Sequence, residues 1–137
     1  MNVVPVFLLV EPSPILRSRL QEWLENVLID PRIFIAANGL EALWLAAQEE
    51  PSHILIEIFL PDITGFQVVR QMRQGLPAAR IIATGSHESR FFLKMICSAG
   101  ADEFILKKNL YNKLLPLWGY LQDKRMDNGT TITRLDH

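Results

Sequence analysis

Four polar side chains follow apolar runs of strand length and could do chemistry together. Glu11 and Glu57 are carboxylates, Thr84 is a hydroxyl and Lys107 is an amine. Carboxylates bind divalent cations or accept a phosphoryl group, and a nearby ammonium neutralises negative charge. In a doubly wound sheet, ligands bind at the carboxyl ends of the strands, where all four residues are expected. The sequence therefore predicts one small polar pocket that contains them.

The elements that must position these residues alternate between strand-like and helical patterns. This alternation predicts an α/β fold: a doubly wound, five-stranded parallel sheet with helices on both faces. The apolar runs mostly lack strict alternation with polar residues, as is typical of strands covered on both faces. The predicted strands are residues 6–10, 32–36, 53–60, 80–83 and 103–106.

Capping residues indicate where the helices begin and end. Pro14 suits a first helical turn, Thr64 and Gln67 form a capping-box pattern, and Gly100 suits the end of a helix over residues 89–99. A fifth helix within residues 110–123 is harder to place, because it would contain Pro116 and Gly119. The predicted N-caps of the first three helices are Ser13, Asn38 and Thr64.

Length and composition indicate one ordered domain. The chain has 137 residues, of which 49% are hydrophobic, which is enough for a packed core. A formal net charge of -1, with the two signs interspersed, argues against nucleic-acid binding by this domain and against attraction to an anionic membrane. We expect a cytoplasmic location, because the apolar N-terminal run is too short to span a membrane and resembles no targeting signal. The single cysteine, Cys97, is interpreted as a buried structural thiol.

Three separate segments resemble the receiver domain of response regulators in two-component signalling. They are LLVEPSPILRSRL, PSHILIEIFLPDITGFQVVRQMR and IIATGSHESRFFLKMICSAGADEFILKKNL. Their order and spacing fit the family over roughly residues 4–122, and so do landmarks such as Pro61 and Gly65. A glycine-rich phosphate loop, which an unrelated cofactor-binding enzyme of similar fold would need, is missing after the first strand, where the sequence is EPSP.

The composition changes near the C-terminus. We expect a receiver-like domain over residues 1–124 and a polar tail or linker over residues 125–137. Asp127, Asn128 and Gly129 form a turn signal, so a short extra hairpin strand is an alternative for this segment.

The resemblance implies transfer of a phosphoryl group from a histidine kinase to an aspartate beside a bound Mg²⁺. Glu57 stands at the phosphoacceptor position and Glu11 at the first acidic position, while the backbone carbonyl of Phe59 is the third metal ligand that the family implies. The switch and phosphate-sensing positions correspond to Thr84, Phe104 and Lys107. We expect signalling by binding, with no catalytic residue and no enzymatic turnover.

Three positions depart from the family pattern. Glu57 replaces the aspartate, Pro12 replaces a second metal-binding acid, and Lys108 replaces the proline that usually follows the lysine. Pro12 has no side-chain oxygen, so Mg²⁺ binding is expected to be weak or absent. Glu57 is one methylene longer than aspartate, and a displacement of about 1 Å can cost roughly a hundredfold in rate.

These departures predict a phosphorylation-independent protein-interaction module. The alternative is a Mg²⁺-dependent receiver that is phosphorylated on an atypical acceptor. Within the first hypothesis, Glu57 either imitates a phosphorylated aspartate by reaching toward Thr84 or Lys107, or forms an ion pair with Lys107 without a signalling consequence. The expected partner is another protein or a second copy, bound through the face near Phe91, Phe92 and Phe104, since adjacent aromatic residues leave one ring exposed. Trp44 is expected to fill a core or half-buried position.

Overall fold

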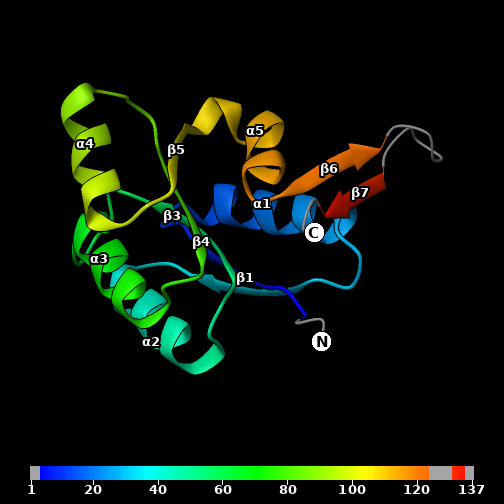
Figure 1. Ribbon diagram of the computed structural model, residues 1–137, viewed down its shortest axis with the longest axis horizontal. Coiled ribbons are helices and arrows are strands. Elements are labelled where there is room, and N and C mark those ends of the chain that lie inside the picture. The colour runs from blue at the N-terminus through cyan, green and yellow to red at the C-terminus, as the bar shows by residue number, and fades with distance from the viewer. Residues whose placement is uncertain (1–3, 124–130, 135–137) are drawn as a thin grey trace.

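The computed structural model describes residues 4–123 and 131–134, and five parallel strands form one sheet between two layers of helices (Figure 1). The strand order is β2-β1-β3-β4-β5, so the chain reverses its direction of winding after β2. The predicted fold class is therefore confirmed. The strands are β1 (Val6–Val10), β2 (Arg32–Ala36), β3 (His53–Glu57), β4 (Arg80–Gly85) and β5 (Glu103–Leu106).

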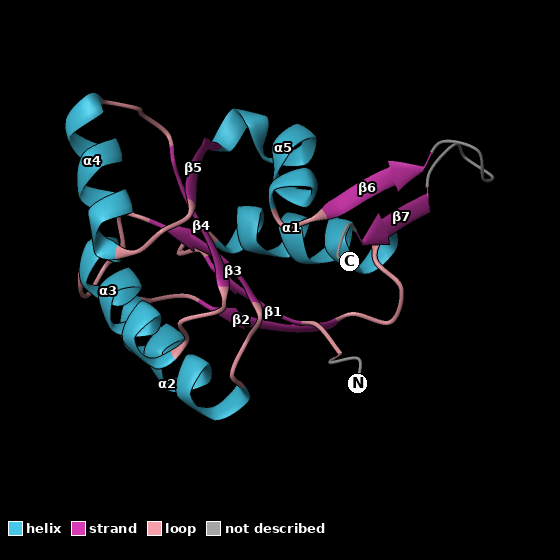
Figure 2. Cartoon of the chain, in the orientation of Figure 1, coloured by secondary structure: helices cyan, strands magenta, loops and turns pink. Residues whose placement is uncertain are grey.

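Helices follow the strands in the predicted order, as Figure 2 shows. The side chains of the three predicted N-caps accept backbone hydrogen bonds, the capping box of Thr64 and Gln67 is complete, and Ser89 caps the fourth helix in the same way. Gly100 ends the fourth helix with a φ of 124°, a value that only glycine adopts easily. The helices are α1 (Pro14–Val27), α2 (Gly39–Glu49), α3 (Gly65–Gly75), α4 (Arg90–Ala99), the 3₁₀ turn η1 (Lys107–Asn109) and α5 (Leu110–Leu117).

Two hydrophobic cores lie on opposite faces of the sheet. Successive residues of β3 point to alternate sides, so that Ile54 and Ile56 pack under α2, α3 and α4, while Leu55 packs under α1 and α5. All three side chains are almost completely buried. The sheet is therefore covered on both faces, which explains why its strands lack a polar alternation.

The third strand and the fifth helix are shorter than predicted. β3 ends at Glu57: the amide of Ile58 still donates to the carbonyl of Thr84 in β4 at 3.0 Å, but the amide of Phe59 turns back to Oε2 of Glu57. α5 ends at Leu117, one residue after Pro116, and Gly119 follows with a φ of 96°. The chain then forms a separate antiparallel hairpin of β6 (Tyr120–Asp123) and β7 (Thr131–Arg134), which crosses the expected boundary at residue 124.

Candidate functional site

The four predicted site residues stand at the carboxyl ends of the strands. Glu11 follows β1, Glu57 ends β3, Thr84 lies in β4 and Lys107 begins η1 after β5. β1 and β3 are neighbours at the point where the strand order changes direction, so their two carboxylates lie side by side. Lys107 starts two strands away from β3 and reaches the carboxylates with its long side chain.

The ammonium of Lys107 binds both carboxylates. Its Nζ lies 2.5 Å from Oε1 of Glu57 and 3.1 Å from Oε1 of Glu11. Both glutamates are buried, and the Lys107 side chain is 23% exposed. Glu11 Oε1 accepts no hydrogen bond from elsewhere among the described residues, so the lysine is its only charge partner there. Two buried negative charges thus depend on one positive charge.

The second oxygen of each carboxylate is held by the backbone. Glu57 Oε2 accepts a hydrogen bond from the amide of Phe59 at 2.9 Å, and Glu11 Oε2 accepts one from the amide of Ser13 at 2.9 Å. Both bonds reach two residues ahead, which closes a local turn after each strand. The two carboxylates are therefore fixed at both oxygens.

The environment of Lys107 keeps it charged. Burial alone would lower the pKa of this lysine, but hydrogen bonds to Glu57 and Glu11 outweigh burial, and the pKa is raised above its ordinary value of 10.5. A charged donor between two carboxylates makes stronger hydrogen bonds than a neutral one would. Lys107 is therefore positively charged at neutral pH.

Thr84 is buried beside the acidic pair without joining it. The residue pairs with Glu57 in the β3–β4 ladder, but its hydroxyl donates a hydrogen bond to the carbonyl of Ile105 at 2.6 Å. A hydroxyl has one proton to donate. Thr84 therefore has no donor left for Glu57 in this arrangement.

Arg17, which the sequence did not single out, bonds to the loop that follows β1. Nη1 of Arg17 donates to the carbonyl of Glu11 at 2.9 Å and to that of Pro12 at 3.4 Å. The arginine is on the first turn of α1, four residues after its N-cap. Its position near a strand end was the only signal in the sequence that could have found it.

The matched family model covers residues 7–117 and describes the response regulator receiver domain. The chain belongs to this family. ExaE, a transcriptional activator protein of Pseudomonas putida, is 31% identical over 100 residues, which are 73% of this chain and 47% of that protein. The chain spans no more than about half the length of the first curated relatives that it matches.

Solved receiver structures share the fold. The chemotaxis protein CheY4 of Vibrio cholerae superposes with a TM-score of 0.75 at 21% identity, over 84% of this chain and 99% of that one. The Mn²⁺-bound form of the response regulator Rcp1 gives a TM-score of 0.69 at 26% identity, over 84% of this chain and 90% of that one. Receivers thus include metal-bound members.

The donor set of this receiver does not suit a divalent cation. Oε1 of Glu11 and Oε1 of Glu57 both contact Lys107, and Pro12 offers no side-chain oxygen. Among residues 4–123 and 131–134, no group of three or more His, Cys, Asp and Glu side chains could hold a metal ion. Mg²⁺ needs several oxygen ligands and their negative charge. Weak metal binding by this receiver stays a prediction.

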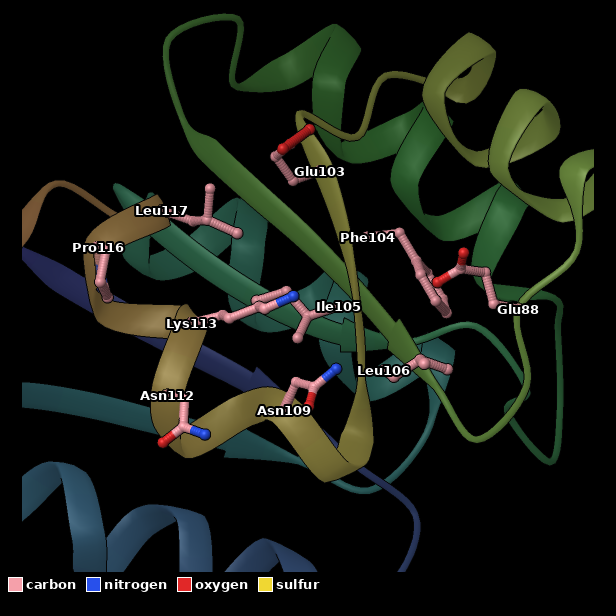
Figure 3. A pocket seen from close by; sticks show the side chains of 10 residues that line it. All are labelled: Glu88, Glu103, Phe104, Ile105, Leu106, Asn109, Asn112, Lys113, Pro116 and Leu117. Carbon is pink, nitrogen blue, oxygen red and sulfur yellow. The ribbon is translucent and has the colours of Figure 1, made fainter.

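Phe104, the remaining predicted switch position, lines a groove of this receiver. Phe104 is half-buried on β5 and lines a groove of about 470 Å³ between the loop before α4 and helix α5 (Figure 3). Glu103 and Glu88 lie on opposite sides of Phe104, and Asn109 and Lys113 lie along α5 and the turn before it. Lys108 is exposed in η1 and makes no contact with the acidic pair among the described residues.

An aromatic cluster lies beside the acidic pocket. Phe59 is 55% exposed, and its ring meets that of Phe92 edge-on with centroids 5.5 Å apart. Phe91, which is 67% exposed, and Phe66 also contact Phe92. The prediction selected Phe59 only for its backbone carbonyl. The ring of Phe59 connects the loop after β3 with α4, and sequence spacing does not reveal a contact between segments so far apart in the chain.

Two interpretations of single residues are wrong. Trp44 was expected in a core or half-buried position and is 62% exposed, because Ala42 and Ala46 form the buried face of α2. Cys97 was expected to be buried and is exposed, because Ile96 and Ala99 form the buried face of α4.

None of the described helices is long and apolar enough to span a bilayer.

Proposed function

We propose that this receiver acts as a phosphorylation-independent protein-interaction module. The observation that supports the proposal is the position of Lys107, whose ammonium lies between Glu11 and Glu57. The positive charge that would compensate an incoming phosphoryl group already neutralises the two carboxylates.

Both carboxylate oxygens of Glu57 are engaged, which argues against attack by Glu57 on a phosphoryl group. A carboxylate that accepts a phosphoryl group needs a free oxygen in line with the donor and strong compensation of negative charge. Oε1 of Glu57 is bound to Lys107, and Oε2 is bound to the amide of Phe59. Breaking either contact costs energy, and Pro12 supplies no metal ligand to compensate for it.

The position of Thr84 bears on the phosphate-mimic hypothesis. A mimic that acts through Thr84 needs the Thr84 hydroxyl to turn toward the carboxylate, as a switch residue turns toward a bound phosphoryl group. The hydroxyl instead donates to the carbonyl of Ile105. The contacts therefore give no support to a mimic that acts through Thr84, while the contact of Glu57 with Lys107 fits either role that the sequence left open.

We assign partner binding to the surface around α4, β5 and α5. Phe91 projects from α4, and Phe104 forms an apolar part of the neighbouring groove (Figure 3). The polar rim of Glu88, Glu103 and Lys113 offers charges of both signs beside these rings. Exposed aromatic side chains within a polar rim are typical of protein interfaces. The partner is therefore another protein, and turnover is not part of the function.

Titration with a phosphate analogue tests the proposal. The purified chain is titrated with beryllium fluoride in the presence and absence of Mg²⁺, and backbone amide shifts near residues 57, 84 and 107 are followed by NMR. We expect no saturable, Mg²⁺-dependent change, because Lys107 already occupies both carboxylates. The paired substitutions Pro12→Asp and Glu57→Asp serve as the control, since they restore the family's acids and should produce a Mg²⁺-dependent response.

The outcomes separate the proposal from its alternative. A saturable, Mg²⁺-dependent response of the unmodified chain that Glu57→Gln abolishes would show an atypical phosphoacceptor and would defeat the proposal. A response of the control variant alone supports it. If the control variant is also inert, the inertness has a cause outside Glu57 and Pro12, and the proposal loses its physical basis.

A further inference from the structure

Helix α2 has an exposed apolar face. Leu40 and Trp44 are one turn apart and are 63% and 62% exposed, and Ala47 continues the same face. Beyond Ala47, a groove of about 320 Å³ opens between α2 and α3 and is lined mainly by Leu43, Ala47, Met72 and Leu76. We call Leu40, Trp44, Ala47 and this groove the α2 face. An exposed tryptophan next to an apolar groove marks an interaction surface.

The α2 face is acidic. Glu41 lies beside Leu40, and Glu50 lines the end of the groove. The chain has no lysine or arginine between Arg32 and Arg70. Glu49 is paired with Arg32 at 3.7 Å, whereas Glu50 has no ion-pair partner among the described residues. A ligand of this face should therefore combine apolar side chains with positive charge.

Helix α4 carries the complementary combination. Phe91 and Met95 lie one turn apart on its exposed side, and Arg90 and Lys94 lie beside them with the same spacing. The helix contains no carboxylate. We call Arg90, Phe91, Lys94 and Met95 the α4 face. The chain thus has one acidic and one basic helix face, and each contains exposed apolar side chains.

These two faces cannot meet within one molecule. α3 packs against both α2 and α4 and lies between them in the helical layer, as Figure 1 shows.

We propose that the α4 face of one copy binds the α2 face of a second copy. This inference rests on the proposed function, because it names the partner of the α4 surface. Phe91 and Met95 then cover Trp44 and enter the groove, and Lys94 pairs with Glu50.

The contact joins two different surfaces, so it is heterologous. The helical layer of the first molecule, α2-α3-α4, continues into the α2 of the next molecule, and a free face remains at each end. Such contacts form open chains unless the rotation between neighbours closes a ring. Because charges on the rim of both faces contribute, the association should weaken as salt is added.

Sedimentation velocity of two blocked variants tests the inference. Trp44→Glu blocks the α2 face and leaves the α4 face intact, while Phe91→Glu does the reverse. We expect the unmodified chain to sediment as larger species with rising concentration and each variant to remain a monomer. An equimolar mixture of the variants should form a dimer and nothing larger, because only one intact contact can form. Ile29→Glu, at a residue that is 79% exposed and outside both faces, should associate like the unmodified chain.

Other arrangements give different results. A symmetric α4–α4 dimer survives Trp44→Glu and is lost with Phe91→Glu, a symmetric α2–α2 dimer shows the reverse, and either pattern overturns the inference. A mixture of the two variants without dimers overturns it as well. Circular dichroism of each variant checks that it is folded. Exchange of charges between Glu50 and Lys94 in one doubly substituted chain should retain association, whereas Glu50→Lys alone should weaken it.

The failure of this inference is distinguishable from failure of the proposed function. A chain that stays monomeric up to millimolar concentration overturns the inference and leaves the phosphate-analogue result untouched. Association that requires Mg²⁺ and beryllium fluoride would overturn phosphorylation independence, while the mixing result would still identify the two faces.

Discussion

Lys107 is the residue on which the arrangement of the pocket depends. It is the only cation in contact with the carboxylates of Glu11 and Glu57 among the described residues, and the two carboxylates are almost completely buried. Removing one partner of a buried ion pair leaves uncompensated charge in a region of low dielectric constant. Loss of this lysine should therefore cost more stability than loss of an exposed charge.

We expect Lys107→Met to lower the free energy of unfolding by on the order of 3 kcal/mol, the lower end of the range for broken buried pairs, because the lysine is partly exposed. Urea unfolding at neutral pH measures this change. Lys108→Met is the matched control, since the adjacent lysine is exposed, and it should change stability little. Equal losses in the two variants would contradict the role of Lys107.

The difference in stability between the unmodified chain and Lys107→Met should depend on pH. The pKa of Lys107 is raised in the folded state, so the contribution of its charge is fully present below the ordinary value of 10.5 and is lost as the pH rises through the folded value. The difference in stability between the unmodified chain and Lys107→Met should therefore be constant near neutral pH and shrink above about pH 10.5.

At the scale of elements, the loop between β3 and α3 connects the start of α2 and the start of α3 with the end of β3. Asp62, in this loop, accepts hydrogen bonds from the amides of Gly39 at 2.8 Å and Leu40 at 2.9 Å, at the start of α2. Gly65 begins α3 so close to β3 that an added Cβ would lie 2.5 Å from the Cα of Ile58. The loop that carries Phe59 is thus held between two helix N-termini.

Asp62→Asn should lower the melting temperature at neutral pH, because the variant loses the charge and one acceptor at the N-terminus of α2. The hydrogen bond from Leu40 is the main cause of a lowered pKa of Asp62 relative to its ordinary value of 3.8. The stabilisation is therefore present above pH 3.8 and is lost as the pH falls through the lower folded value. Thermal unfolding at neutral and acid pH measures this.

Asp30→Asn provides the control for this experiment, because Asp30 is exposed after α1 and asparagine tolerates its positive φ of 46°. The control should melt like the unmodified chain at every pH. A difference between Asp62→Asn and the unmodified chain that stays constant into strong acid would show that the charge of Asp62 does not stabilise α2.

At the scale of the whole molecule, the end of α5 is anchored at the end of the sheet opposite the acidic pocket. The indole Nε1 of Trp118 donates to the carbonyl of Ile54 at 3.3 Å, and the carbonyls of Leu117 and Trp118 are bonded by Arg80 and His53. The Trp118 ring packs against Phe7 and His53. This anchor fixes the point from which the β6–β7 hairpin begins.

Trp118→Phe should lower the free energy of unfolding by about 2 kcal/mol, because it removes buried volume and leaves the carbonyl of Ile54 without its donor. Chemical denaturation measures the loss. Trp23→Phe is the control, since Trp23 is half-buried and packs edge-on against the exposed Tyr111. The anchor would be unimportant if the control lost as much stability as Trp118→Phe.

The sequence by itself determined the elements and the composition of the pocket. Strand and helix patterns, N-caps and chain order are local properties, and parallel strands bring their carboxyl ends to one edge, so Glu11, Glu57, Thr84 and Lys107 could be located in advance. The receiver family also followed from the residues. The length of β3 was overestimated, because the strand ends where the amide of Phe59 turns back to the side chain of Glu57, and the apolar run does not reveal this turn.

Only the tertiary structure decided which side chains meet. The sequence left Glu57 free to approach Thr84 or Lys107, and the folded chain brings Lys107 to both carboxylates while Thr84 bonds to Ile105. The packing of α2 also leaves Trp44 exposed, since the small residues Ala42 and Ala46 suffice to pack this helix on the sheet. The physical reason is that contacts between strands depend on the packing of segments far apart in the chain, and so does the face that a helix buries. Local sequence patterns do not encode this packing.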